Sequence, residues 1–198
     1  MNETLSARVD TVGSIPIGHL IWEDFHLNKD KIIDLCLQQE KPNVIESNVA
    51  TKIKSNIWES PFNFLDTSTE LLNLKLWLLK ATKDFVNYVN KTDYNLTITE
   101  SWAHVARPGG FHGPHRHTLS TWSGIFYVYA DDKEHAENWF FNHFHLPMIP
   151  GYEFYSEQYK SDFVPGKLII FPSTMLHYAS PYLGKDKRIV IAFNSIVI

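Results

Sequence analysis

The sequence predicts a mainly β domain of the α+β class, in which a barrel or sandwich of short strands is braced by N-terminal helices. Helical periodicity is confined to residues 1–94, and short β-type runs separated by turn residues fill residues 95–198. No internal repeat, low-complexity tract or linker interrupts the chain, and 198 residues are enough for one core. We therefore expect a single domain over residues 1–198, with bracing segments in 1–94 and the barrel in 95–198.

Two helices are expected in the first half. Asn28 is a suitable N-cap for a helix over residues 29–39. Thr67 and Glu70 have the spacing of a capping box, and the apolar residues that follow recur at three- and four-residue steps as far as about Asn90. The second helix is long enough to cover one side of a barrel.

The strands are predicted from short alternating or apolar runs. A short edge strand and a turn are expected within residues 9–20, and a turn at 164–167 precedes a buried run. The other β-type runs lie at residues 101–106, 115–117, 124–130, 139–144, 167–171 and 188–198. Gly113 and Pro114 are expected to end any strand that precedes the run at 115–117.

Composition excludes several classes of protein. The formal net charge of -4 argues against non-specific nucleic-acid binding. Cys36 is the only cysteine, so no intramolecular disulfide can form. The chain starts with a polar segment and has no run near the roughly 18 apolar residues that a membrane span needs. A cytoplasmic protein is therefore expected.

Three histidines are candidates for a metal site. His115 and His117 lie two residues apart, so their side chains would share one face of an extended strand. His177 follows the buried run at 167–171, where the bend at Pro172 could deliver it to the mouth of a barrel. Three imidazoles would form a facial site for iron, zinc, copper or nickel. His112, an odd step from both members of the first pair, is expected to point away.

Four other histidines are interpreted as loop, surface or packing residues. His143 and His145 form a second pair two residues apart, but no later segment near them resembles the one around His177. We interpret that pair as part of a solvated or substrate-facing loop. His19 and His26 are interpreted as surface or packing residues.

Arg188 is the candidate for binding an acid. It begins the strand that follows His177, where its planar, permanently charged guanidinium could face a carboxylate inside the barrel. The alternative is a surface arginine beside Lys185 and Lys187.

Four segments between residues 101 and 194 resemble a known superfamily. In order they are SWAHVARPGG, HRHTLSTWSGIFYVY, VPGKLIIFPSTMLH and RIVIAFN. Together they are similar to the 2-oxoglutarate- and Fe(II)-dependent oxygenases, and nearest to a group of small oxygenases from phages and bacteria. The resemblance implies a double-stranded β-helix, the jelly-roll or cupin-like barrel.

The resemblance also implies a set of functional residues. It implies Fe(II) held by His115 and His177 as the first and last ligands, and 2-oxoglutarate bound through its distal carboxylate by Arg188. His117 is the third candidate ligand on its spacing alone. Tyr127 lies where many relatives have a tyrosine that binds the co-substrate. The implied reaction is hydroxylation of an unidentified substrate with O2, releasing succinate and CO2.

Two positions depart from the pattern of the superfamily. Most members have H-x-D or H-x-E, whereas this chain has H-R-H, so His117 leaves the metal without a neutralising carboxylate. Many members also have Ser or Thr two residues after the arginine, where this chain has Val190.

These departures keep three alternatives open. One is a cupin-like metal enzyme, for which Gly109 and the H-x-H fit but the later glutamate is replaced by Thr121 and Trp122. The second is a three-histidine zinc hydrolase or lyase, and the third is a non-catalytic binding protein on the same barrel. The partner of the site is an unknown small molecule or protein residue, with no nucleic acid and no membrane expected, and exposed barrel edges would allow a homodimer.

Overall fold

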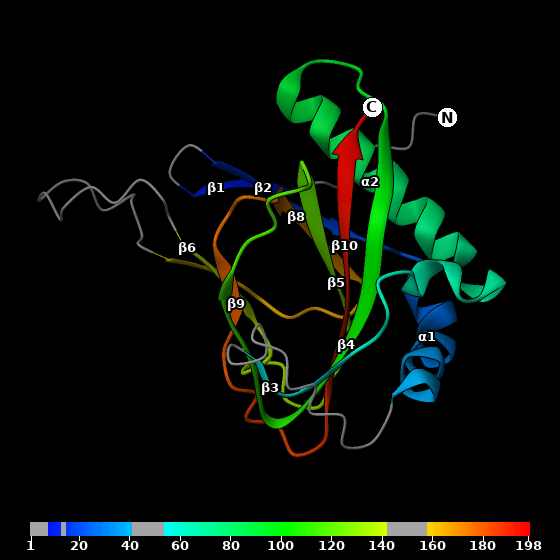
Figure 1. The fold of residues 1–198 in the computed structure, drawn as a ribbon, viewed down its shortest axis with the longest axis vertical. Coiled ribbons are helices and arrows are strands. Elements are labelled where there is room, and N and C mark those ends of the chain that lie inside the picture. Colours follow the sequence, from blue (N-terminus) through cyan, green and yellow to red (C-terminus); the bar gives the residue numbers. More distant parts are fainter. Residues whose placement is uncertain (1–7, 13–14, 41–53, 142–157) are drawn as a thin grey trace, which may run out of the picture.

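The structure is a computed structural model that describes residues 8–12, 15–40, 54–141 and 158–198. Antiparallel strands dominate, and two α-helices and two short 3-10 turns lie among the described residues (Figure 1). In chain order the elements are β1 (Arg8–Val12), β2 (Ile15–Ile21), α1 (Phe25–Gln39), β3 (Lys54–Glu59), η2 (Phe64–Asp66), η3 (Thr69–Leu71), α2 (Leu72–Asn90), β4 (Leu96–His115), β5 (Trp122–Ala130), β6 (Asn138–Phe141), β7 (Gln158–Ser161), β8 (Lys167–Pro172), β9 (His177–Ala179) and β10 (Arg188–Val197). None of the helices within these ranges is long and apolar enough to cross a membrane.

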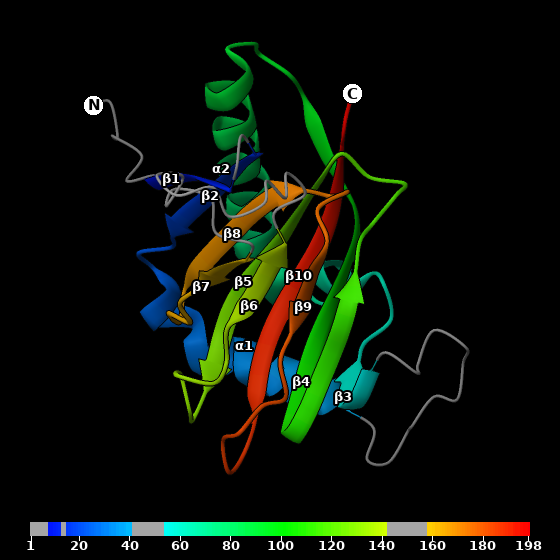
Figure 2. The same cartoon turned by 90° about the vertical axis from the view of Figure 1, so that its left-hand side faces the viewer.

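The described strands form one curled antiparallel sheet. Its order is β1-β2-β8-β5-β10-β4-β9-β6-β7, and β3 pairs with the outer part of β4. Strands β2, β8, β5, β10 and β4 make a broad layer whose outer face carries α1 and α2 (Figure 2). Because β4 continues into the β9-β6-β7 side, the sheet curls over its own inner face and forms a half-barrel (Figure 1).

Side-chain alternation along the central strands divides the core in two. On β5, Phe126 and Val128 belong to the cluster beneath the helices, whereas Ile125 and Tyr127 belong to the cluster inside the half-barrel. Strands β8 and β10 alternate in the same way, because successive side chains of a strand point to opposite faces. This periodicity places every second residue of β10, starting with Arg188, on the inner face.

The second predicted helix is confirmed, but its cap differs. The side chain of Ser68, rather than Thr67, accepts the backbone N–H of Glu70, and the 3-10 turn η3 leads directly into α2. Thr67 instead donates its hydroxyl to the carbonyl of Phe64 at 2.7 Å. The helix buries residues at the predicted spacing, among them Leu78, which is fully buried against the sheet.

The first predicted helix starts earlier than expected. Helix α1 begins at Phe25, and Asn28 lies within its first turn, donating its side-chain amide to the carbonyl of Asp24 at 3.0 Å. The extra turn is held by tertiary packing, because Phe25 is buried with its ring 5.5 Å from that of Phe126. A capping rule applied to the local sequence contains no information about this contact.

The strand predictions around the histidines need correction. Strand β4 runs through Gly113 and Pro114 and ends at His115, so the expected strand at 115–117 does not form. Strand β9 pairs with β4 at His112 and again at His115, which keeps the Gly113-Pro114 step extended. A bulge lies between the two paired positions. The turn at 164–167 is confirmed: Lys167 N–H donates to the carbonyl of Val164 at 3.0 Å.

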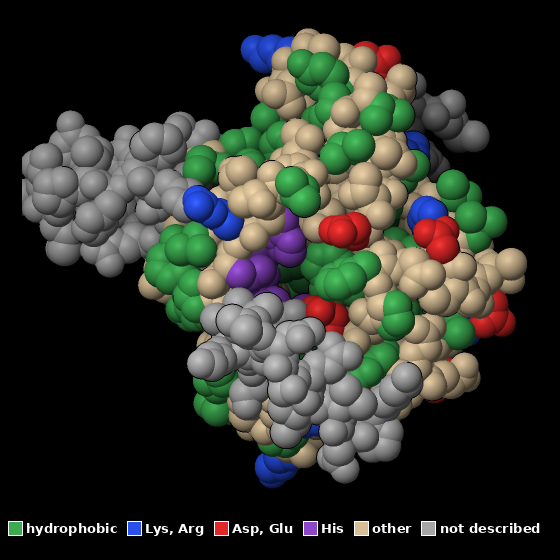
Figure 3. All heavy atoms as spheres, in the orientation of Figure 1, with side chains coloured by type: hydrophobic (Ala, Val, Ile, Leu, Met, Phe, Trp, Pro, Cys, Tyr) green, Lys and Arg blue, Asp and Glu red, His purple; other side chains and the backbone are tan. Residues whose placement is uncertain are grey.

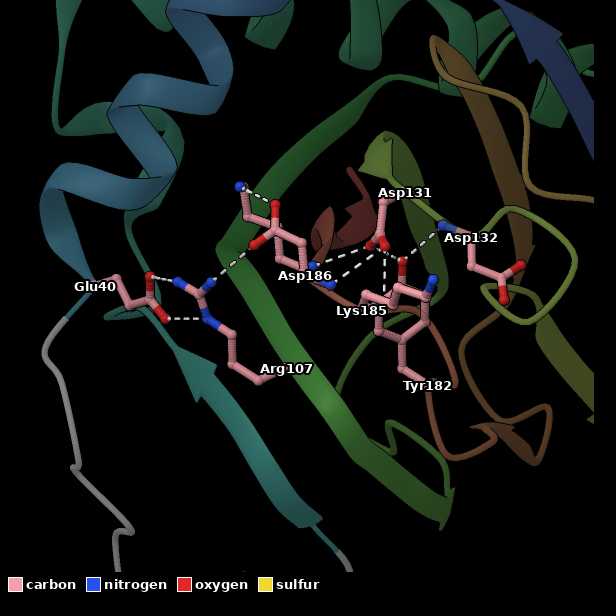
Figure 4. Close-up of polar contacts among 8 residues, drawn as sticks. Glu40, Arg107, Asp131, Asp132, Tyr182, Lys185 and Asp186 are labelled. Atoms are coloured by element: carbon pink, nitrogen blue, oxygen red, sulfur yellow. Dashed lines mark hydrogen bonds and ion pairs between the residues drawn. The ribbon is translucent and has the colours of Figure 1, made fainter.

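A polar cluster joins several segments near Arg188, the first residue of β10 (Figure 4). Arg107 of β4 forms a two-pronged ion pair with Glu40, just beyond α1, and its Nη1 lies 3.4 Å from Asp186. The carboxylate of Asp131, which follows β5, accepts the hydroxyl of Tyr182 and the backbone N–H groups of residues 185–187. The loop before β10 is thereby tied to the end of β5.

Candidate metal centre

Five of the described histidines line a hollow on the inner face of the half-barrel (Figure 3). The hollow has a volume of about 460 Å³, including space continuous with solvent. Its walls come from β3, β4, β5, β8, β9 and β10 and from Asn138 of β6. The lining residues that matter below are Trp102, His104, His112, His115, His117, His177 and Arg188.

The structure brings together the three histidines named from the sequence. One ring nitrogen each from His115, His117 and His177 lies within 4.8 Å of the others. His115, at the end of β4, is the register partner of His177, at the start of β9. His117 lies beyond the strand and is held by its backbone N–H, which donates to the carbonyl of Ser173 at 2.8 Å.

Backbone carbonyls orient two of the rings. Nδ1 of His115 lies 2.8 Å from the carbonyl oxygen of Gly113, and Nδ1 of His177 lies 2.9 Å from that of Met175. Since a carbonyl only accepts, each Nδ1 carries a proton, and in the neutral form of each ring the lone pair is on Nε2. Burial, reinforced by the nearby His115, lowers the pKa of His177 well below its usual value, so this ring is neutral and competent to bind a metal.

His112 does not point away, contrary to the sequence prediction. It is buried, lines the hollow and stacks on His115 with ring centroids 3.7 Å apart. The bulge between the two residues shifts the register and so breaks the odd–even rule on which the prediction depended.

The sequence prediction missed His104 and Glu59. His104 is buried on β4, forms a short ion-pair contact through Nε2 with Glu59 of β3, and lies with its ring 5.5 Å from that of His112. Glu59 and His104 are direct cross-strand partners. The separation of 45 positions between them gives no local signal, so only the pairing of β3 with β4 reveals the contact.

Arg188 is inside the half-barrel, so the alternative of a surface arginine is wrong. Its side chain is 4% exposed and lines the same hollow as the histidines. Nε donates to the carbonyl of Ala136 at 2.7 Å, and Nη2 donates to Oδ1 of Asn138 at 2.6 Å. These bonds fix the plane of the guanidinium without neutralising its charge.

Tyr127 lies beside Arg188 but deeper in the protein. The Cζ atom of Arg188 is 6.0 Å from the centroid of the Tyr127 ring, which stacks on Phe163 at 4.5 Å. Burial raises the pKa of Tyr127 to about 12, so its hydroxyl stays protonated. Within the described part of the chain this hydroxyl is buried without a hydrogen-bond partner, and Tyr127 is not among the residues lining the hollow.

The tryptophans have different surroundings. Trp102 lines the hollow with its ring 5.6 Å from that of His117. Trp122 belongs to the cluster beneath the helices, where it meets Phe85 edge-on. Trp139 is half-buried and stacks on Tyr178. Only the first of the three therefore contributes to the walls of the site.

The remaining histidine predictions have mixed outcomes. His19 contacts the hydroxyl of Tyr159 at 2.9 Å through Nε2, and the ring of His26 contacts the carbonyl of Glu23, as expected of packing and surface residues. His143 and His145 lie outside the described residues.

The residues present fit a divalent metal with an acidic ligand. Three imidazole ligands would leave further coordination positions for other ligands, as a catalytic metal requires. Arg188, in the same hollow, provides a fixed cation for a carboxylate.

Comparison with known structures shows the fold. A prolyl-4-hydroxylase from Pseudomonas putida has a TM-score of 0.60 at 13% identity, covering 91% of this chain and 92% of that one. A viral collagen prolyl hydroxylase from Paramecium bursaria Chlorella virus-1, solved as a 2-oxoglutarate complex, has a TM-score of 0.58 at 13% identity, covering 90% and 94%. The non-heme α-ketoglutarate-dependent carbocyclase SnoK of nogalamycin biosynthesis has a TM-score of 0.67 at 12% identity, covering 90% and 78%. The curled sheet is thus the predicted double-stranded β-helix.

A family model identifies the site-bearing half of the chain. Residues 100–194 match the model described as "Putative 2OG-Fe(II) oxygenase". No curated protein sequence matches the chain. The matched segment contains all three clustered histidines and Arg188, and the match does not favour the cupin-like, zinc or non-catalytic alternatives. Residues 100–194 are thus similar to the 2-oxoglutarate- and Fe(II)-dependent oxygenases, and the chain has the fold of solved enzymes that use 2-oxoglutarate.

Proposed function

We propose that this protein hydroxylates a small molecule or a protein side chain with O2, converting 2-oxoglutarate to succinate and CO2. The observation that carries the proposal is the meeting of three imidazoles and one buried arginine in a single hollow. The residues divide into a metal-binding side, a co-substrate side and a substrate-facing wall.

The proposed metal-binding side consists of His115, His117 and His177. Neutral imidazoles whose Nδ1–H groups donate to backbone carbonyls are oriented ligands, and this holds for the first and the last of the three. When bound, Fe(II) supplies the activation of O2. The protein holds the ligands, excludes water and orients the other reactants.

The proposed co-substrate side is built on Arg188. Its guanidinium is buried and held in plane by Ala136 and Asn138, so it can meet the distal carboxylate of 2-oxoglutarate with little loss of side-chain entropy. The hydroxyl of Tyr127 would donate to the same carboxylate. Val190, two residues along β10, contributes only apolar surface, so no hydroxyl at that position assists the arginine.

The substrate-facing wall is formed by Trp102, His104 and His112 on β4, with Ile57 beside them. Aromatic and imidazole rings favour a flat or weakly polar group over a highly charged one. Among similar structures, a prolyl hydroxylase from Trichoplax adhaerens is complexed with a peptide fragment, whereas SnoK belongs to the biosynthesis of a small molecule. Because the hollow is continuous with solvent, both kinds of substrate can approach it.

The reaction is tested without knowing the substrate. The full chain is purified without oxygen, and Fe(II) and 2-oxoglutarate are added in turn. The proposal expects a weak visible charge-transfer band that needs both additions, and succinate formation once O2 is admitted. A protein that retains zinc and gives neither the band nor succinate contradicts the proposal.

Variants test the ligand assignment. His115→Ala and His177→Ala are each expected to abolish Fe(II) binding while circular dichroism retains the signature of the folded chain, because each removes an oriented ligand. His26→Ala, an exposed histidine on α1, is the matched control and should keep full metal content. Unchanged metal content in either of the first two variants would show that the site lies elsewhere.

A further inference from the structure

One of the three clustered histidines is held differently from the other two. The side-chain amide nitrogen of Asn194 lies 3.4 Å from Nδ1 of His117. An amide N–H2 group only donates, so Nδ1 of His117 must be the acceptor and the proton of the neutral ring must sit on Nε2. This is the opposite tautomer to that of His115 and His177, whose Nδ1 atoms donate to carbonyls.

The orientation of the Asn194 amide is fixed by its other partners. Nδ2 donates to a carboxylate oxygen of Glu100, its cross-strand partner on β4, at 2.8 Å. Oδ1 accepts the hydroxyl of Ser123 at 2.7 Å. Turning the amide round with Glu100 in place would set Oδ1 against a carboxylate, so the present orientation is the one that the network satisfies.

We propose that Asn194 is a positioning residue that decides whether His117 joins the metal. In the metal-free protein the site then offers two ring lone pairs, from His115 and His177, and one N–H, from His117. His117 becomes a ligand through Nε2 only when the Asn194 amide turns round. This inference rests on the proposed metal site.

The network can be satisfied in both arrangements. After the turn, Nδ1–H of His117 donates to Oδ1 of Asn194, and Nδ2 donates to the hydroxyl oxygen of Ser123. The Ser123 hydroxyl can then donate to Oγ of Ser173, which already lies 2.8 Å away. One proton has moved from Nε2 to Nδ1, so the charge of the ring is unchanged.

Of Asn194, Ser123 and Glu100, only Glu100 loses a partner in the turned arrangement. Its position is exposed, so water replaces the amide, whereas Asn194 is only 3% exposed and depends on its protein partners. Glu100 therefore holds the Asn194 amide in the orientation that keeps Nε2 of His117 from binding the metal, and this restraint is called the lock below. Releasing the lock should strengthen metal binding even though a nearby negative charge is removed.

The tautomers are tested first, by long-range ¹H–¹⁵N NMR of the histidine rings in the metal-free full chain. His117→Ala assigns the signal of that ring by its loss. We expect Nδ1–H for His115 and His177 and Nε2–H for His117 in the wild-type protein, and Nδ1–H for His117 in Asn194→Asp, because a carboxylate only accepts. An Nδ1–H form of His117 in the wild-type protein overturns the inference.

Metal titration tests the lock, with Co²⁺ as the probe and its absorption spectrum as the readout. We expect Glu100→Ala to bind Co²⁺ about threefold to tenfold more tightly than the wild-type protein, the equivalent of one exposed hydrogen bond to a charged group. A general electrostatic or structural role of Glu100 would weaken binding instead, and that result overturns the inference. If the wild-type protein binds no Co²⁺, the proposed metal site is refuted. The NMR measurement still shows whether Asn194 sets the position of the proton on His117.

Discussion

Burial suits Arg188 to the proposed role of binding an acid. A guanidinium in solution binds a carboxylate weakly, because water competes and the side chain must be ordered. Here the neighbours of Arg188 fix its plane, and the rings of Tyr127 and Phe163 lie 6.0 Å from its Cζ atom. Burial lowers its pKa from the usual high value, which reflects the cost of keeping the charge out of water. A carboxylate ligand recovers that cost.

Arg188→Lys is expected to weaken 2-oxoglutarate binding by about tenfold to a hundredfold while leaving Fe(II) binding intact. Lysine keeps the charge but loses the planar fork, which corresponds to about 1.5–3 kcal/mol for hydrogen bonds to a charged group. Titration of the anaerobic Fe(II) protein with 2-oxoglutarate measures the change. Lys185→Ala, in the loop before β10, should titrate as the wild-type protein does, and equal effects of the two substitutions would exclude Arg188 as the acid site.

The residues of the site were predictable from the sequence only where one strand carries the geometry. The spacing of His115 and His117 pointed to a pair that does meet, although the strand expected to hold both ends at His115. The position of His177 after an apolar strand was informative as well. His112 was predicted to point away because a bulge cannot be read from alternation. No sequence pattern assigned a role to Asn194, Ser123 or Glu100, and their network arises from the register of β10 with β4 and β5.

At the scale of elements, the loop before β10 depends on one carboxylate. The carboxylate of Asp131 accepts hydrogen bonds from the Tyr182 hydroxyl and from three backbone N–H groups (Figure 4). A single charged acceptor satisfies these crowded donors better than water would. The Tyr182 hydroxyl, more than the backbone donors, lowers the pKa of Asp131 to about 2. The clamp therefore fixes the start of the strand that carries Arg188.

Acid is expected to release this clamp in a defined window. The folded pKa of Asp131 is below the usual value of about 3.9, so its contribution to stability is present above about pH 4 and is lost as the pH falls towards about 2. Asp131→Asn should therefore be less stable than the wild-type protein at neutral pH, by a small amount because the group is exposed, and the difference should vanish near pH 2.

Denaturant unfolding at several pH values measures this difference. Tyr182→Phe removes the principal donor and should give a pH dependence between those of the wild-type protein and Asp131→Asn. A difference between Asp131→Asn and the wild-type protein that persists unchanged down to pH 2 would contradict the clamp.

The elements themselves were predictable where periodicity is long. Helix α2 follows the predicted spacing over five turns of apolar residues, and most predicted strands coincide with observed ones. The errors are at ends and at short strands: the start of α1 is set by Phe25 packing on Phe126. Strands β7 and β9, with four and three residues, are too short for alternation to reveal.

At the scale of the molecule, one layer of strands serves two purposes. The outer faces of β5, β8 and β10 pack under the helices, and the inner faces of β5, β8 and β10 build the half-barrel and its site. The proposed metal ligands line the inner hollow, and the strands behind them pack against the apolar face of α2. Stability of the helix layer and integrity of the site should therefore be lost together.

Leu78→Ala in α2 is expected to lower the free energy of unfolding by about 2–5 kcal/mol, because the side chain is fully buried between the helix and the sheet. Leu76→Ala, two residues away on the same helix, removes a side chain that is 55% exposed and should change it by less than about 0.5 kcal/mol. Tryptophan fluorescence and Co²⁺ absorption, followed in one denaturant titration, should share a single midpoint that moves to lower denaturant only in Leu78→Ala. If the Co²⁺ signal survives after the fluorescence transition in that variant, the site is held by the half-barrel alone and the helix layer is dispensable to it.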